Sequence, residues 1–260
     1  MLRSKPAIAA MVLILAACGN QGSGKQGSAD KGSGTDANKA AIASTGNNVG
    51  VRTKVLAAVE PFETLTETAF TATAPELAKS IDATDAAARS IATLVPGDVA
   101  QRLQAQSAAI HRAQTSGQRA DVALASIEGF REVVGAVPAG APIPADVSLL
   151  DYAGLRYDSD VQANPPRWDD TAKAIIYARE RTAALAPLAQ AAPLLPAMNA
   201  AIGGMETAAS AHDAARARAG AKVELDLVDK LEAAFAPPVA RLEQIAPAVN
   251  RWGIPAGAEV

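Results

Sequence analysis

The chain has 260 residues, and its 24 Lys and Arg against 27 Asp and Glu give a formal charge of −3. This mildly acidic balance argues against a nucleic-acid-binding protein, because phosphates attract clustered positive charge. The chain has one cysteine, so it has no internal disulfide.

The N-terminus has the three-part layout of a secretory signal. Arg3 and Lys5 form a short positive region, Ala7 to Leu15 is a compact apolar run, and small residues follow. The apolar run is too short to span a bilayer as a mature helix. Residues 1–17 are therefore predicted to be a cleaved signal peptide, and its loss leaves the mature chain at about −5 because two cations leave with it.

The four residues Leu15-Ala16-Ala17-Cys18 resemble the lipobox of bacterial lipoproteins. The resemblance implies cleavage before Cys18, a diacylglycerol on its thiol and acylation of its new amino group. Several acyl chains anchor a protein firmly, whereas one chain alone holds it only marginally. Gly19 replaces the aspartate that the family links to inner-membrane retention, which implies an outer-membrane anchor with the folded part facing the periplasm or the cell exterior. The alternative is an ordinary exported protein with a free thiol.

Residues 18–50 are predicted to be the lipidated cysteine and a flexible tether. The stretch from Gly19 to Gly50 is rich in Gly, Ser, Asn and Gln, and its only large apolar residues are Ile42 and Val49. Such a segment buries too little surface to offset the entropy of ordering, so we expect disorder. A flexible coil of this length has a root-mean-square span of roughly 30 Å.

Residues 51–260 are predicted to form an all-α domain. Alanine is abundant, aromatic residues make up 3% of the chain, and no segment alternates with a period of two. Several segments instead carry apolar or small residues at steps of three and four, which is typical of helices with one buried face. We expect five to seven helices with short connections, arranged as an antiparallel bundle.

The first half of this domain contains clear helix boundaries. An apolar stripe runs from Val51 to Ala69, with Pro61 as a kink or restart. Thr73-Ala74-Pro75-Glu76 is a capping box that opens the next helix. After a Pro–Gly turn, Asp98 is expected to cap one long helix whose stripe continues through Gly117 to Val134.

The second half is predicted in the same way. The expected elements are a loop over Val137–Pro144, a helix over Asp146–Gln162, a helix opened by Pro165-Pro166 at Arg167, a stripe from Leu195 to Ala209 that ends near Gly220, and a long helix from Val228 to Trp252 interrupted at Pro237-Pro238. A faint echo between Ser116–Leu124 and Ala219–Leu227 raises the hypothesis of a duplicated helical hairpin.

No charged residue lies between Arg181 and Glu206, a stretch long enough to span a membrane. Three prolines interrupt it, so we favour a buried helix–turn–helix corner with its break at Pro193 to Pro196 over a membrane span.

The sequence shows no arrangement for nucleophilic catalysis, and we expect a non-enzymatic protein without a cofactor. The only histidines are His111 and His212, and neither lies in a nucleophile motif. The two histidines are weak candidates for a metal site. The alternative interpretation of each is a core or helix-end histidine.

The most informative segment is Leu149 to Arg181, which holds four of the chain's nine aromatic residues among arginines and acids. Tyr and Trp combine an apolar face with a polar tip, and Arg recognises carboxylates and stacks on rings. The candidate binding residues are Tyr152, Arg156, Tyr157, Trp168, Asp169 and Tyr177. The alternative is an aromatic corner that pins a connecting helix against the bundle, with arginines and acids paired at its rim.

These features predict an outer-membrane lipoprotein whose helical domain binds a protein or cell-envelope partner through the Tyr152 to Tyr177 surface. The alternative function is a carrier or sensor of a small ligand or metal, with a pocket between helices. A partner-binding face leaves the aromatic residues exposed in one patch, whereas a carrier encloses them around a cavity.

Overall fold

The computed structural model describes residues 48–236, and these residues are helical without a single strand. The all-α prediction is confirmed. Helix is already present at residues 48–57, three residues before the expected end of the tether, and it is followed by eight further helices. These are α2 (Val59–Thr68), α3 (Ala74–Ile91), α4 (Gly97–Thr115), α5 (Arg119–Gly135), α6 (Ala145–Gln162), α7 (Trp168–Leu185), α8 (Leu195–Ser210) and α9 (Ala214–Phe235).

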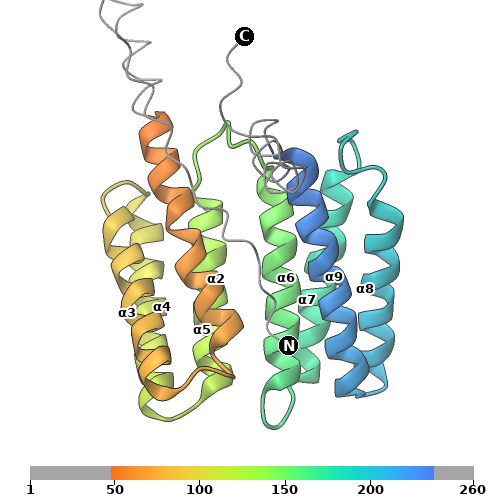
Figure 1. Ribbon diagram of the computed structural model, residues 1–260, viewed down its shortest axis with the longest axis horizontal. Coiled ribbons are helices and arrows are strands. Elements are labelled where there is room, and N and C mark those ends of the chain that lie inside the picture. Colours follow the sequence, from red (N-terminus) through yellow and green to blue (C-terminus); the bar gives the residue numbers. More distant parts are fainter. Residues whose placement is uncertain (1–47, 237–260) are drawn as a thin grey trace, which may run out of the picture. The chain divides into compact units, whose positions relative to one another are not determined.

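The eight helices form two four-helix bundles (Figure 1). In the first bundle, each of α2 to α5 packs on the next, and α5 closes the bundle against α2. In the second bundle, α6 to α9 follow the same order, and α9 closes against α6. The bundles meet where α5 packs against α6. Short connections within each bundle explain the antiparallel arrangement.

Local sequence signals set several boundaries as predicted. The capping box is present: the Thr73 backbone N–H donates to the Glu76 carboxylate at 2.8 Å, at the start of α3. The first apolar stripe is interrupted at Ala58, just before Pro61. The loop over residues 137–144 is also present, as are α6 and α7 at their expected positions.

The expected long helix after Asp98 is wrong, because the chain reverses at Gly117 and forms α4 and α5. Gly117 has a φ of 72°, in the left-handed region that glycine adopts at little cost. The N–H of Gly117 donates to Gln114 at 3.1 Å and the next N–H donates to Ala113 at 2.9 Å, which is the Schellman ending of a helix. The predicted cap is also wrong: α4 begins after Pro96, and Asp98 lies inside the helix.

The expected helix end near Gly220 is wrong as well. Helix α8 ends at Ser210, and Gly220 lies inside α9. The duplicated hairpin that the sequence echo suggested is not found in that register, because residues 116–124 span a turn while residues 219–227 lie within one helix. The turns with matching positions in the two bundles are those at Gly117 and His212.

The uncharged stretch between Arg181 and Glu206 forms the end of α7, a turn over residues 186–194, and most of α8. The turn begins earlier than the predicted break, and Pro196 lies in the first turn of α8, where its missing N–H costs nothing. Among the described residues, no helix is both long and apolar enough to cross a membrane. The predicted signal, Cys18, nearly all of the tether and the expected helix beyond Pro237 lie outside the described residues.

Close helix packing holds each bundle together. Phe62 of α2 is fully buried and lies against Gly129 of α5, where an added Cβ would be 2.3 Å from the phenyl ring. In the second bundle Gly154 of α6 faces Glu224 of α9 at similarly short range. One continuous apolar core includes residues of both bundles. Buried apolar contacts therefore hold the two bundles together, in addition to the chain connection between them.

Candidate functional site

The structure places five of the six predicted binding residues at two places and buries the sixth, Tyr157, in the core of the second bundle. The first is the interbundle seam, formed where Asp121, Glu128 and Arg131 of α5 meet Tyr152 and Arg156 of α6 and Arg167 at the start of α7. The second is a groove between α7 and α8. The aromatic residues therefore form neither one exposed patch nor one enclosed cavity.

Tyr152 is the centre of the seam. Its side chain is buried, and its hydroxyl donates to Glu128 Oε1 at 2.8 Å. The ring of Tyr177 meets the Tyr152 ring edge-on, with centroids 5.2 Å apart. Burial, followed by the neighbouring Glu128 carboxylate, raises the pKa of Tyr152 to about 12. This hydroxyl therefore remains a hydrogen-bond donor at neutral pH.

Arginines surround these rings. Arg156 donates to Glu128 across the seam and, through Nε, to Asp160 Oδ2 at 3.3 Å. Arg131 lies over the Tyr152 ring with its guanidinium carbon 5.5 Å from the centroid. These contacts occupy the side chains of Tyr152 and Arg156, which the sequence predicted to bind a partner.

Another arginine, Arg181, lies over the ring of Tyr177. The guanidinium carbon of Arg181 lies 5.0 Å from the centre of that ring, and its Nη1 donates to Asp146 at 3.0 Å. Tyr152, Arg156 and Tyr177 thus pack and pair within the protein. This is the arrangement expected for a corner that pins helices together.

Tyr157 lies in the core of the second bundle. Its side chain is fully buried, and its hydroxyl donates to the backbone carbonyl of Met205 at 2.8 Å. Burial raises its pKa to about 12. Tyr157 is not accessible to a partner.

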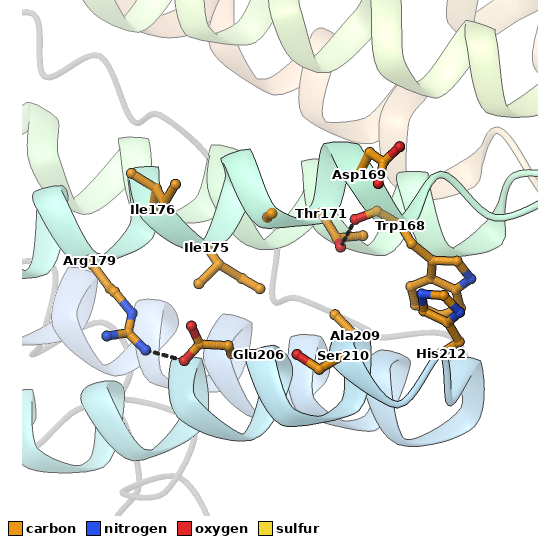
Figure 2. A pocket seen from close by; sticks show the side chains of 11 residues that line it. Trp168, Asp169, Thr171, Ile175, Ile176, Arg179, Glu206, Ala209, Ser210 and His212 are labelled. Atoms are coloured by element: carbon orange, nitrogen blue, oxygen red, sulfur yellow. Dashed lines mark hydrogen bonds and ion pairs between the residues drawn. The ribbon is translucent and has the colours of Figure 1, made fainter.

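The groove between α7 and α8 has a volume of about 440 Å³ (Figure 2). Ile175 and Ala209 line its interior, and Arg179 of α7 pairs with Glu206 of α8 at one end. Ile176 stands beside it with 59% of its surface exposed, more than the other large apolar residues of the described chain. The groove therefore combines an apolar interior with a polar end.

The other end of the groove is an aromatic wall. The rings of Trp168 and His212 stack with centroids 5.1 Å apart and an interplanar angle of 9°. His212 has a φ of 51°, a left-handed conformation that is uncommon for a residue other than glycine. It ends α8 in a Schellman arrangement, with its N–H on Ala209 at 2.9 Å and the next N–H on Ala208 at 3.0 Å. His212 occupies the turn position that Gly117 occupies in the first bundle, although a histidine is strained there. This strain indicates that the position of its ring matters.

Asp169 is exposed at the rim of this groove. Figure 2 shows its carboxylate directed away from α8, so it is available to solvent and not to the groove interior. Among the predicted binding residues, Trp168 and Asp169 are thus the two at the groove, and the weak metal candidate His212 lies there as well.

The sequence did not identify Ile175, Ile176, Arg179 and Glu206 as site residues, although a signal existed for the first two. Ile175 and Ile176 are adjacent on one helix, so they cannot both face the core. The pairing of Arg179 with Glu206 depends on how α7 meets α8, which no local pattern reveals.

The structure does not bring the two histidines together. His111 lies on α4 of the first bundle, where its Nε2 is 2.7 Å from Asp85 Oδ2, while His212 lies in the second. Within residues 48–236 no group of three or more His, Cys, Asp or Glu side chains is arranged to hold a metal ion.

Comparison with known proteins gives no relative: no family model, no curated protein and no solved structure matches this chain. Function must therefore be argued from the site.

Proposed function

We propose that this protein is an outer-membrane lipoprotein whose helical domain binds a partner protein without catalysing a reaction. Cys18 carries the lipid, and the segment between Cys18 and the helix that begins at residue 48 tethers the domain in the periplasm or at the cell exterior. The lipobox-like residues Leu15-Ala16-Ala17-Cys18 support the anchor. The α7–α8 groove, with its strained His212 stacked on Trp168, is the observation that supports binding.

The apolar lining of the groove favours an apolar segment of the partner. Ala172, Ile175 and Ala209 supply apolar lining, and the charged groups Arg179 and Glu206 pair with each other at one end. A helical or extended segment that places apolar side chains against Ile176 and into the groove fits this surface.

A carrier of a small ligand is the second candidate. The groove volume of about 440 Å³ lies in the range of small-molecule sites, and a stacked aromatic pair suits a flat ligand. The native mass spectrum of the protein extracted gently from its host membranes separates the two functions. A discrete added mass of small-molecule size supports the carrier.

The test of partner binding is co-purification from host membranes with two matched variants. Ile176→Glu places a charge beside the groove, and Val223→Glu places the same charge on α9, where the valine is 52% exposed. We expect a protein that co-purifies with the wild type to be retained by Val223→Glu and lost by Ile176→Glu. Equal retention by both variants contradicts binding at the groove.

A further inference from the structure

Asp160 lies behind both arginines that cross the interbundle seam. Its side chain has 0% exposure, in the last turn of α6. Arg156 donates to its carboxylate through Nε at 3.3 Å, and the Arg167 backbone N–H donates to its carbonyl oxygen at 2.9 Å. The other carboxylate oxygen, Oδ1, has no hydrogen-bond partner among the described residues.

The same two arginines pair with acids of α5 on the far side of the seam. Arg156 donates to Glu128, and Arg167 donates to Asp121. Asp160 therefore competes with Glu128 of the first bundle for the guanidinium group of Arg156, whereas Arg167 meets Asp160 through its backbone N–H. The charge of Asp160 sets how strongly the Arg156 guanidinium is held on the α6 side.

We propose that Asp160 is a proton-operated latch between the two bundles. In its ionised form Asp160 draws Arg156 toward α6, and in its protonated form it leaves Arg156 to the Glu128 carboxylate of α5. Proton uptake thereby strengthens the contacts across the seam. This inference does not depend on the proposed partner or on the lipid anchor.

The surroundings of Asp160 favour proton uptake at a mildly acidic pH. Burial raises its pKa to about 6, and the attraction of Arg156 lowers it only in part. From α7, the Asp170 carboxylate adds to the rise and Arg167 opposes it.

The remaining charged groups nearby have partners of their own. Asp170 pairs with Lys173 on its own helix, and Arg131 pairs with Glu128 on α5. On the side of α9, Arg218 pairs with Asp158. Asp160 differs from these groups because its ion-pair partner, Arg156, is shared with Glu128. A change in the charge of Asp160 therefore alters how Arg156 is divided between the two carboxylates.

The direction of the effect on stability follows from linkage. The pKa of Asp160 is about 6 in the folded chain against an ordinary value of 3.8, so the folded protein binds this proton more tightly. The stabilisation of the folded chain by the proton on Asp160 is complete below pH 3.8 and is lost as the pH rises through 6. Relative to an Asp160→Asn variant, the unfolding equilibrium constant of the wild type should rise by about 100-fold across this window, since each pKa unit is a factor of ten.

The direct test is a pH titration of arginine side-chain Nε–H signals by NMR in the full chain. Between pH 7.5 and 4.5 the Arg156 signal should move with a midpoint near the pKa of Asp160, and it should not move in Asp160→Asn. Arg102 is the internal control. Its Nε donates to Glu132 at 2.7 Å, and this pair does not involve Asp160. An Arg156 signal that stays fixed, or moves equally in the variant, overturns the latch.

A second measurement reports the seam and needs only the wild type. Amide hydrogen exchange in α5 around residues 121–128, corrected for its intrinsic pH dependence, should slow several-fold on acidification. Unchanged protection across the same pH range overturns the proposal, even if Asp160→Asn fails to fold.

Discussion

Trp168 and His212 stack face to face at 5.1 Å, although they begin and end different helices of the second bundle. The contact ties the α6–α7 connection to the α8–α9 turn and forms one end of the groove between α7 and α8. His212 adopts a left-handed backbone to make it. The favourable stacking of the two rings is therefore obtained together with an unfavourable left-handed backbone at His212.

Substitutions at His212 separate these two effects. Relief of the left-handed strain in His212→Gly, worth about 1 kcal/mol, offsets the lost stacking, worth about 0.5–1.5 kcal/mol. We expect its free energy of unfolding to stay within about 1 kcal/mol of the wild type. His212→Ala loses the ring and keeps the strain, so it should be about 1 kcal/mol less stable than His212→Gly. Urea unfolding measures both variants, and equal stabilities would contradict the strain.

The seam predicts different costs for two tyrosine hydroxyls. Tyr152→Phe removes the donor to Glu128 in a buried site, so it should lower the free energy of unfolding by about 1 kcal/mol. Tyr177→Phe is the control, because its hydroxyl has no hydrogen-bond partner among the described residues, and it should change stability by less than about 0.5 kcal/mol. A Tyr177→Phe cost as large as that of Tyr152→Phe would refute the assigned role of this hydrogen bond.

Two glycine substitutions test the packing of the bundles. Gly129→Ala brings a methyl group against the buried Phe62 ring, and the resulting overpacking should cost about 1–3 kcal/mol. Gly203→Ala adds the same methyl group on α8, where no atom lies within 4 Å, and should stabilise the protein by about 0.5–1 kcal/mol. Thermal unfolding distinguishes these opposite signs, and a neutral Gly129→Ala would mean that α2 and α5 are not in close contact.

The anchor is tested at Cys18. Cys18→Ser removes the thiol that the lipobox resemblance assigns to lipid attachment, so the variant should lack acylation and leave the membrane fraction. Membrane fractionation and the mass of the mature N-terminus check both effects. Unchanged fractionation with the membrane would show that the lipobox interpretation is wrong.

Local signals in the sequence predicted the parts of the fold that local chemistry determines. The Thr73 capping box and the proline-rich loop over residues 137–144 are set by side chains close in sequence. The turn at Gly117 also had a local signal, the glycine itself, but the continuous apolar stripe favoured a single helix. The His212 turn had none, because histidine takes that conformation where Trp168 meets its ring.

The candidate site was harder to predict than the fold. The aromatic segment was identified, but Tyr152 and Tyr157 face other helices and are buried, which depends on how α5, α6 and α8 meet. Trp168 reaches the groove from the same segment. Residue type gave the chemistry, while tertiary packing decided which side chains remain accessible.

Site-specific photo-crosslinking in host cells tests whether a partner binds at the α7–α8 groove. A photoreactive residue replaces Ala172, which lines the groove, or Ala219, which is exposed on α9. We expect one discrete partner to crosslink at position 172 and not at 219, and we expect Ile176→Glu to abolish the product. A product of the same mass and yield at both positions, or one that survives Ile176→Glu, would contradict binding at the α7–α8 groove.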